Sequence, residues 1–147
     1  MNKLICTFAS LLLLFSSCNY SRQYINQTED KEDAEKVTNH YYDFVLQQQF
    51  DSIVKLCSQH FLEHTDEERF KKILNKTFDK LGALKKTDLI HWETRRVIGS
   101  NPLSEYYFIY ESTYERSIAK EQFRLVREED SVIRIISYQI NSDRFLD

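Results

Sequence analysis

The chain has 147 residues, with 20 lysines and arginines against 23 aspartates and glutamates, and its formal net charge is −3. Binding to nucleic acid depends on neutralising phosphates with basic side chains, so this balance argues against a nucleic-acid partner. The length is enough for one domain built around one hydrophobic core.

The N-terminus has the pattern of an export signal. Lys3 supplies a positive charge, residues 4–15 are mostly apolar, and the small residues Ser16 and Ser17 follow. This apolar run is too short to cross a bilayer, which takes about 20 residues. A charged start, a short apolar core and small residues after it are typical of a signal peptide.

Cys18 stands directly after Ser16 and Ser17, and this arrangement resembles the lipobox of bacterial lipoproteins. The resemblance implies that residues 1–17 are removed and that Cys18 becomes the lipid-carrying N-terminus. Asn19 follows the cysteine in place of an aspartate, which by the lipoprotein sorting rule favours the outer membrane, facing the periplasm. An ordinary secretory signal and a bare transmembrane anchor remain the alternatives.

The number of cysteines left after removal of the signal excludes a disulfide within the mature chain. Cys6 leaves with the signal and Cys18 carries lipid, so Cys57 alone remains. Cys57 shares a helical spacing with the apolar residues Ile53 and Phe61. We therefore expect a buried and unreactive thiol, because a free cysteine packs as a small hydrophobic residue.

Residues 18–32 have no apolar periodicity and are expected to form the lipidated cysteine and a flexible tether. Residues 33–147 then form the folded domain. Three helices are predicted in its first half: one from Asp33, one around 51–57, and one from Thr65 to Gly82. The third begins with a capping box formed by Thr65 and Glu68, and Gly82 is expected to end it.

After Gly82 the apolar period changes to two, which indicates strands. The predicted strands cover residues 90–98, 106–114, 120–127 and 132–140. Helices followed by strands with short connections favour an α+β fold. We expect three N-terminal helices packed on one face of a curved antiparallel sheet of about four strands.

The order and lengths of these elements resemble the nuclear transport factor 2-like (cystatin-like, cone-shaped) superfamily, and most of all its bacterial envelope families of unassigned function. The segments that carry the resemblance are "YYDFVLQQQFDSIVKLCSQHFL", "DKLGAL" and "FRLVREEDSVIRIISYQI". The resemblance implies a cavity between helices and sheet. It does not imply one activity, because the superfamily holds enzymes, binding domains and delivery factors.

The stretch "HFLEH", residues 60–64, matches the His-x-x-Glu-His pattern of one class of zinc peptidases. In those enzymes both histidines and the glutamate lie within one long helix. Here Thr65 is expected to cap the next helix, so the motif spans a helix end. The chain is also too short to enclose a peptide. We therefore reject the peptidase interpretation and predict no metal site and no cofactor.

Four residues are candidates for lining a pocket: Tyr106, Tyr110, Tyr138 and His91. The tyrosines would line the cavity of the cone, and His91 has Glu93 as a neighbour on one strand face. Aromatic packing of the tyrosines is the alternative. No set of nucleophile, base and stabilising donors is evident, so no catalytic residue is predicted.

The sequence thus favours a non-catalytic envelope lipoprotein whose domain binds a small ligand or a partner protein. The alternative is a small pocket enzyme, of isomerase or dehydratase type, that uses His91 or a cavity tyrosine. The exposed face of the third helix carries a basic row, which is either a solvated surface or an anion-binding strip. Its members are Arg69, Lys72, Lys76 and Lys80.

Overall fold

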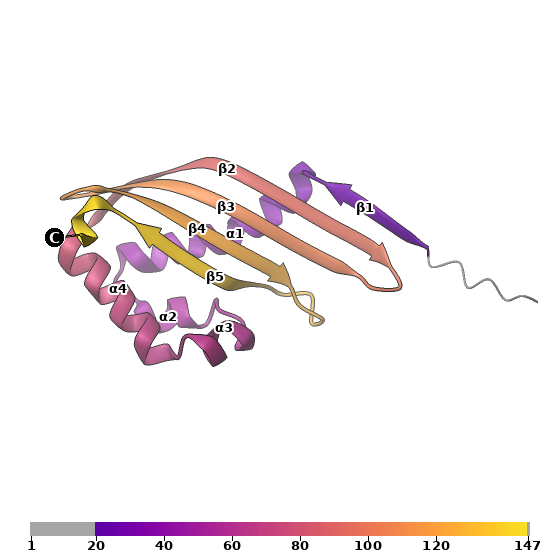
Figure 1. The fold of residues 1–147 in the computed structure, drawn as a ribbon, viewed down its shortest axis with the longest axis horizontal. Helices are drawn as coiled ribbons and strands as arrows, with labels where there is room; N and C mark the ends of the chain where they lie inside the picture. Colours follow the sequence, from indigo (N-terminus) through magenta and orange to yellow (C-terminus); the bar gives the residue numbers. More distant parts are fainter. Residues whose placement is uncertain (1–19, 147) are drawn as a thin grey trace, which may run out of the picture.

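A computed structural model describes residues 20–146. In this part of the chain, four α-helices cover one face of a five-stranded open antiparallel sheet of order β1-β2-β3-β4-β5 (Figure 1). The α+β class is confirmed, with one helix and one strand more than expected. The elements are β1 Ser21–Ile25, α1 Thr28–Leu46, α2 Phe50–Val54, α3 Gln59–His64, α4 Glu67–Leu81, β2 Leu84–Gly99, β3 Leu103–Tyr114, β4 Ile118–Arg127, β5 Ile133–Asn141 and a 3-10 turn, η1, Asp143–Phe145.

The inner face of the sheet, toward the helices, is set by residue alternation along the strands. On β3 the residues at even positions from Tyr106 to Tyr114 are buried, and on β4 the residues at odd positions from Ala119 to Leu125 are buried. The register pairs Phe108 with Phe123, so both rows belong to the same face. The outer face therefore carries the odd positions of β3 and the even positions of β4.

The core is an aromatic cluster centred on Phe123, which has no exposed surface. Its ring centre lies 4.9 Å from that of Tyr41 and 5.1 Å from that of Tyr138. The rings of Tyr42 and Tyr110 lie slightly farther away, at 5.9 and 5.8 Å. Edge-on and tilted contacts at these distances are favourable arrangements of aromatic rings. The cluster ties α1 to the middle of the sheet.

The expected flexible tether over residues 18–32 is wrong for most of its length. Ser21–Ile25 forms β1, which pairs with β2 from Ser21 opposite Gly99 to Ile25 opposite Arg95. The strand is polar and exposed, so it carries no apolar signal, and backbone pairing holds it. After the strand, Asn26 adopts a positive φ of 51°. Its side-chain Oδ1 accepts from the N–H of Thr94, and its backbone N–H donates to the Thr94 carbonyl, both at 2.9 Å.

The first helix also begins earlier than expected, at Thr28 instead of Asp33. Its first turn carries Glu29 and Asp30, whose charges suit the positive end of the helix dipole. Asp30 is buried and pairs with Arg96 of β2 at 3.1 Å. These contacts explain why residues 28–32 belong to the helix.

The expected second helix is broken into α2 and α3. Between them Cys57 makes a parallel bridge with Ile135 of β5, and the N–H of Ser58 donates to the Ile135 carbonyl at 2.9 Å. The Ser58 hydroxyl then caps α3 by accepting from the N–H of Phe61 at 3.0 Å. Pairing with β5 thus replaces the helical hydrogen bonds that the sequence spacing predicted.

The last helix, α4, is capped by Asp66 and not by Thr65, which ends α3. The Asp66 carboxylate accepts from the N–H of Arg69 at 2.8 Å, so the predicted capping box was placed one residue too early. Gly82 ends α4 with a φ of 79°, as expected for a glycine stop. Within residues 20–146, no helix has the length and apolar character needed to cross a membrane.

Candidate functional site

Two of the predicted pocket tyrosines lie in the closed core. Tyr106 and Tyr110 are 2% and 3% exposed. The Tyr110 hydroxyl contacts the Thr38 hydroxyl at 2.6 Å, and the Tyr106 hydroxyl accepts from Nε of Arg127 at 3.3 Å. Both hydroxyls are therefore engaged by the protein, and neither ring lines an open cone.

The third predicted pocket tyrosine, Tyr138, is half-buried, and its hydroxyl donates a hydrogen bond to Glu121. Sequence reasoning did not find Glu121. Glu121 has no exposed surface, and its two carboxylate oxygens accept from Tyr138 at 2.7 Å and from Tyr114 at 2.8 Å. Burial raises the pKa of Glu121, and the hydrogen bonds from Tyr138, Ser112 and Tyr114 lower it in part. The alternation of β4 could have found Glu121, because it occupies a core position between Ala119 and Phe123.

The enclosed space between the sheet and the helices α1, α2 and α4 is too small for a ligand. Beside Tyr41 and Tyr114 it amounts to about 10 Å³, whereas ligand pockets measure about 300–1,000 Å³. Aromatic rings fill the layer between α1 and the middle of the sheet. A binding site must therefore be sought on the surface.

His91 lies on the opposite, outer face of the sheet from the three tyrosine rings. Its ring nitrogen Nε2 contacts the Glu93 carboxylate at 2.9 Å, and both side chains are well exposed, at 46% and 64%. The structure therefore brings His91 and Glu93 together. Of the three tyrosines, Tyr106 is among the residues that line the same groove, whereas Tyr110 and Tyr138 are not. The exposed pair of His91 and Glu93 therefore lacks the apolar enclosure of a buried acid–base site.

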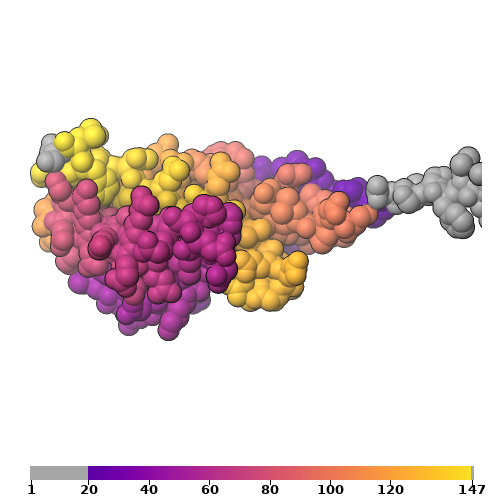
Figure 2. Space-filling model, turned by 60° about the horizontal axis from the view of Figure 1, so that its bottom comes forward, coloured from indigo at the N-terminus to yellow at the C-terminus, as the bar shows by residue number. Residues whose placement is uncertain are grey.

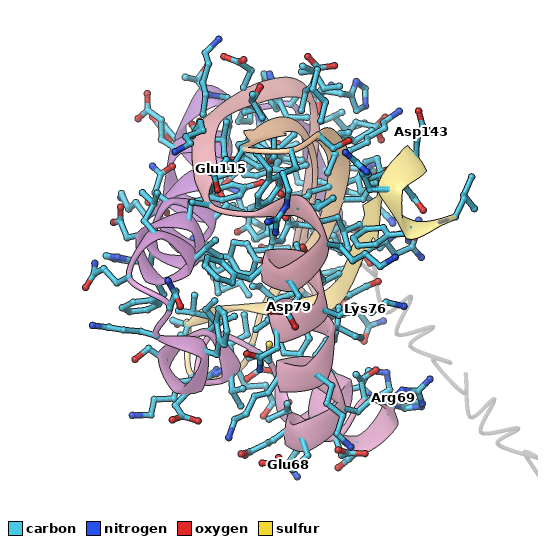
Figure 3. The ribbon with its side chains drawn as sticks, turned by 90° about the vertical axis from the view of Figure 1, so that its left-hand side faces the viewer. Glu68, Arg69, Lys76, Asp79, Glu115 and Asp143 are labelled. Carbon is cyan, nitrogen blue, oxygen red and sulfur yellow. The ribbon has the colours of Figure 1, made fainter. Side chains whose placement is uncertain are left out.

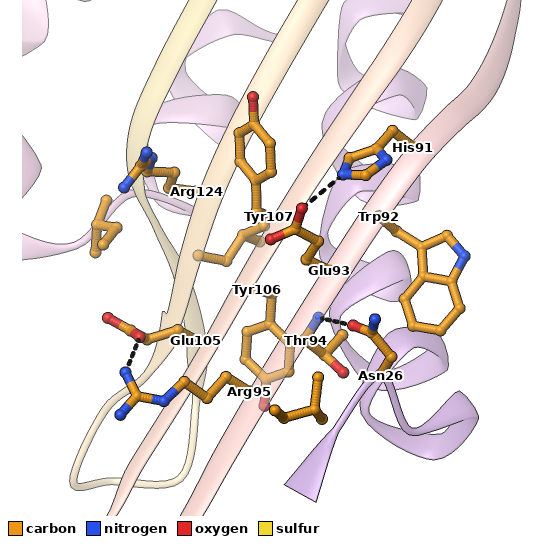
Figure 4. Close-up of a pocket in the computed structure, with 13 residues that line it drawn as sticks. Asn26, His91, Trp92, Glu93, Thr94, Arg95, Glu105, Tyr106, Tyr107 and Arg124 are labelled. Carbon is orange, nitrogen blue, oxygen red and sulfur yellow. Dashed lines mark hydrogen bonds and ion pairs between the residues drawn. The ribbon is translucent and has the colours of Figure 1, made fainter.

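The outer face holds a groove of about 630 Å³, shown in Figure 4. Its walls come from β1 through β5, so the whole sheet contributes. The side chains that matter below are His91, Glu93, Arg95, Glu105, Tyr107 and Arg124, with Ile25 and Ile136 as aliphatic edges. The volume lies within the range of small-molecule sites.

Tyr107 stands at the centre of this groove. The register places it between Glu93 of β2 and Arg124 of β4. The Arg124 guanidinium lies 5.5 Å from the centre of the Tyr107 ring, close enough for a cation–π contact. The ring of His91 lies 6.1 Å away, and the Tyr107 hydroxyl donates to Gln122 at 2.8 Å.

Of the charged side chains in the groove, Arg124 alone has no partner of opposite charge among residues 20–146. Arg95 and Glu105 form an ion pair at 3.5 Å, and His91 contacts Glu93 (Figure 4). Arg124 forms no ion pair with any of residues 20–146. A guanidinium presents several donors in a plane and is suited to binding a carboxylate in two-point fashion. The groove thus offers an unused anion-binding group beside an aromatic ring.

The "HFLEH" motif ends with α3, a helix of six residues. The rings of His60 and His64 lie edge-on at 4.5 Å, and Nδ1 of His64 contacts the carbonyl of His60 at 2.9 Å. The expectation that the motif spans a helix end is therefore wrong, because His60, Glu63 and His64 all lie within this one short helix. In the described part of the chain, no three His, Cys, Asp or Glu side chains gather as metal ligands.

Cys57 is buried, as predicted, with 5% of its surface exposed. Burial raises the pKa of its thiol to about 12. The thiolate, which is the reactive form, is therefore scarce at neutral pH. Cys18 lies outside the described residues.

Sequence reasoning did not find Tyr107, Arg124, Arg95 or Glu105, because their meeting depends on the register between three strands. A comparison of the chain with protein families, curated proteins and solved structures finds no match.

Proposed function

We propose that the chain is a lipid-anchored protein of the cell envelope whose domain binds a small molecule without transforming it. The signal-like residues 1–17 followed by Cys18 support the anchor, at the outer membrane and facing the periplasm. Helices on one face of an antiparallel sheet support membership of the nuclear transport factor 2-like superfamily. The filled core departs from the open cone of that superfamily, and the outer-face groove takes its place as the binding site.

The position of β1 supports a short anchor. Ser21 is three residues after Cys18, so it lies within about 10 Å of the lipid along a fully extended chain. Ser21 pairs with Gly99, at the turn between β2 and β3. This end of the long axis would rest near the membrane, and the C-terminal end lies opposite (Figure 1). The domain is then held close to the lipid, and not at the end of a long tether.

The anchor predicts that cells fed a fatty-acid analogue label the wild-type chain, whereas Cys18→Ala removes the label and releases the protein from membranes. A thioether-linked diacylglyceryl group plus an N-acyl chain makes release of the wild type negligible, since each buried methylene contributes about 0.8 kcal/mol. Cys57→Ala is the matched control and should keep its label. Label that survives in Cys18→Ala would contradict the anchor.

The ligand class follows from Arg124, which is the observation that carries the proposal. Its guanidinium has no carboxylate partner among residues 20–146 and lies against the Tyr107 ring. Ile25 and Ile136 add aliphatic surface at the edges of the groove. A small carboxylate with an aromatic or aliphatic body satisfies both features, because the anion pairs with Arg124 and the body covers Tyr107.

The same geometry disfavours the pocket enzyme. His91 and Glu93 are exposed in an open groove, and their side chains contact each other at 2.9 Å. An acid–base catalyst needs a group held in an enclosed site with its pKa near the working pH. Turnover of a bound carboxylate that is lost in His91→Ala would restore the enzyme hypothesis.

We expect Arg124→Ala to weaken the binding of small carboxylates by about tenfold or more, because one charge-assisted hydrogen-bonded contact contributes about 1.5–3 kcal/mol. The probes are benzoate, indole-3-acetate and octanoate, titrated by calorimetry against full-length protein in detergent micelles. Their amides should bind more weakly than the acids.

Lys120→Ala is the control for this titration, since Lys120 lies on the same strand and the same face but outside the groove. It should bind as the wild type does. If none of the three acids binds at millimolar concentration, or if Arg124→Ala binds them equally well, the proposed ligand class is wrong.

A further inference from the structure

The free edge of β5 forms a second surface, separate from the outer groove. β5 is the last strand of the sheet, so one of its sides has no neighbouring strand. At Ile135 the chain fills this edge with its own residues. The N–H of Ser58 donates to the Ile135 carbonyl and the Ile135 N–H donates to the Leu56 carbonyl, both at 2.9 Å. The edge therefore already accepts one extended segment, in parallel orientation.

Beyond Ile135, no backbone group of residues 20–146 pairs with the outer side of β5. In an antiparallel ladder, alternate residues direct their backbone groups to opposite sides of the strand. The backbone N–H and carbonyl of Ile135 point to the free edge, so those of its partner Leu125 point toward β3. The backbone groups of Phe123 and Glu121, two and four residues earlier on β4, also point toward β3. Their partners on β5 are Tyr138 and Ile140. The N–H and carbonyl groups of these two residues therefore face the free edge, and neither bonds to a backbone group outside the sheet among residues 20–146.

A groove of mixed polar and apolar lining runs along this edge, between β5 and the helices α3 and α4. Two adjoining hollows of about 220 and 290 Å³ share Phe61, Thr65, Tyr138 and Gln139 in their walls, so they form one channel. Phe70, Ile73 and Ile140 extend the apolar lining toward η1. In Figure 2 the yellow residues of β5 and η1 lie at the surface beside the magenta helices. The channel begins at His60 and His64, the histidines of the "HFLEH" motif.

Two cations flank the lining residue Ile73. Arg69 and Lys76 are exposed, lie one turn before and one turn after it on α4, and point to the side on which Asp143 of η1 lies (Figure 3). Neither forms an ion pair with another described residue. Lys71, on a different face of the same helix, is by contrast paired with Asp51 and Glu68. The basic row seen in the sequence is therefore in part an unpaired cationic rim.

We propose that the β5 edge receives an extended acidic peptide from a partner protein, which adds a strand to the sheet. The peptide backbone pairs with Tyr138 and Ile140, as in other cases of strand addition. Its alternate side chains point to opposite faces of the sheet. The set that faces α4 meets Arg69 and Lys76 on either side of Ile73, so acidic side chains are favoured in that set. This inference goes beyond the small-molecule site, because it uses another surface and another class of partner.

A second copy of this chain fits the edge less well. The only charged side chain of β5 is Arg134, so edge-to-edge pairing of two β5 strands would bring no carboxylate to Arg69 and Lys76. Like charges directly opposed across such an interface are unfavourable. The charge of the rim thus selects an acidic strand.

The test uses a fluorescent ten-residue peptide of alternating valine and glutamate, titrated against full-length protein in detergent micelles. We expect saturable binding that weakens as salt is raised. A peptide in which lysine replaces glutamate should bind at least about tenfold more weakly. Two further peptides are N-methylated, one at the odd-numbered amides and the other at the even-numbered amides. Only one of the two sets of amides faces β5, so one of these peptides should lose binding and the other should keep it.

Two protein variants locate the site. Arg69→Glu with Lys76→Glu should weaken binding by about tenfold or more, whereas Lys55→Glu with Lys120→Glu, of equal charge change, should leave it unaltered. Ile140→Pro removes an outward N–H that the β4–β5 ladder does not use and should also weaken binding, while Ile140→Val should not.

Several outcomes would overturn the inference. They are the absence of peptide binding, equal binding of both N-methylated peptides, and a loss of binding as large in the control pair as in the rim pair. If Ile140→Pro does not fold, the N-methylated peptides still decide. Binding of the wild type to anionic vesicles that is lost in the rim pair, without peptide binding, would assign the rim to a lipid surface instead.

Discussion

Phe123→Ala should lower the free energy of unfolding by about 3–5 kcal/mol, the range for removing a large aromatic side chain from a closed core. Phe123 has no exposed surface and contacts the rings of Tyr41, Tyr42, Tyr110 and Tyr138. Its loss removes the centre of the cluster that joins α1 to the sheet. Neighbouring rings cannot collapse into the space without giving up their own hydrogen bonds.

Urea unfolding followed by circular dichroism measures this change. Ile118→Ala, at an exposed position on the same strand, is the control and should cost less than about 0.5 kcal/mol. A loss below about 1.5 kcal/mol in Phe123→Ala would mean that the aromatic layer is not the core that holds helices and sheet together.

Glu121→Gln should remove a pH dependence of stability that the wild type shows. Burial raises the pKa of Glu121 above its ordinary value of 4.5 in the folded chain. Below pH 4.5 the Glu121 carboxyl is protonated in both the folded and the unfolded chain, so it does not lower the free energy of unfolding. As the pH rises above it, the unfolded chain releases the proton first, and stability falls by up to about 1.4 kcal/mol per pH unit until the raised pKa is passed.

The glutamine variant carries no such titration and keeps nearly the same shape. The difference in unfolding free energy, wild type minus variant, should therefore fall as the pH is raised from 4 to 7. Other carboxylates titrate equally in both proteins and cancel from the difference. A difference that stays constant, or that rises with pH, would contradict a raised pKa for Glu121.

The class of the fold could be predicted from local pattern, but its edges could not. Alternation in 106–114 and 120–127 predicts two strands with one apolar face, and the structure agrees. β1 is polar and exposed, so only its backbone pairing with β2 defines it. The break between α2 and α3 likewise depends on Ile135, about 80 residues away along the chain. Non-local hydrogen bonds of this kind leave no trace in a helical spacing.

The site was harder to predict than the fold, for a related reason. His91 and Glu93 could be placed together on one strand face, but alternation alone does not say which face is inward. The tyrosines of the predicted pocket turned out to face the core. The pairing of Tyr107 with Arg124 needs the register between β3 and β4, which is set by the whole sheet. Glu121 alone could have been found, as a charged residue at an apolar position.

Backbone amide chemical shifts of the full-length protein, titrated with benzoate, indole-3-acetate and octanoate, test the central claim most directly. Binding in the outer groove predicts the largest shifts at Glu93, Tyr107 and Arg124, at about the same ligand concentration, and their loss in Arg124→Ala. Shifts confined to the inner residues around Tyr41 and Glu121, or no shifts with any of the three acids, would contradict a ligand site on the outer face of the sheet.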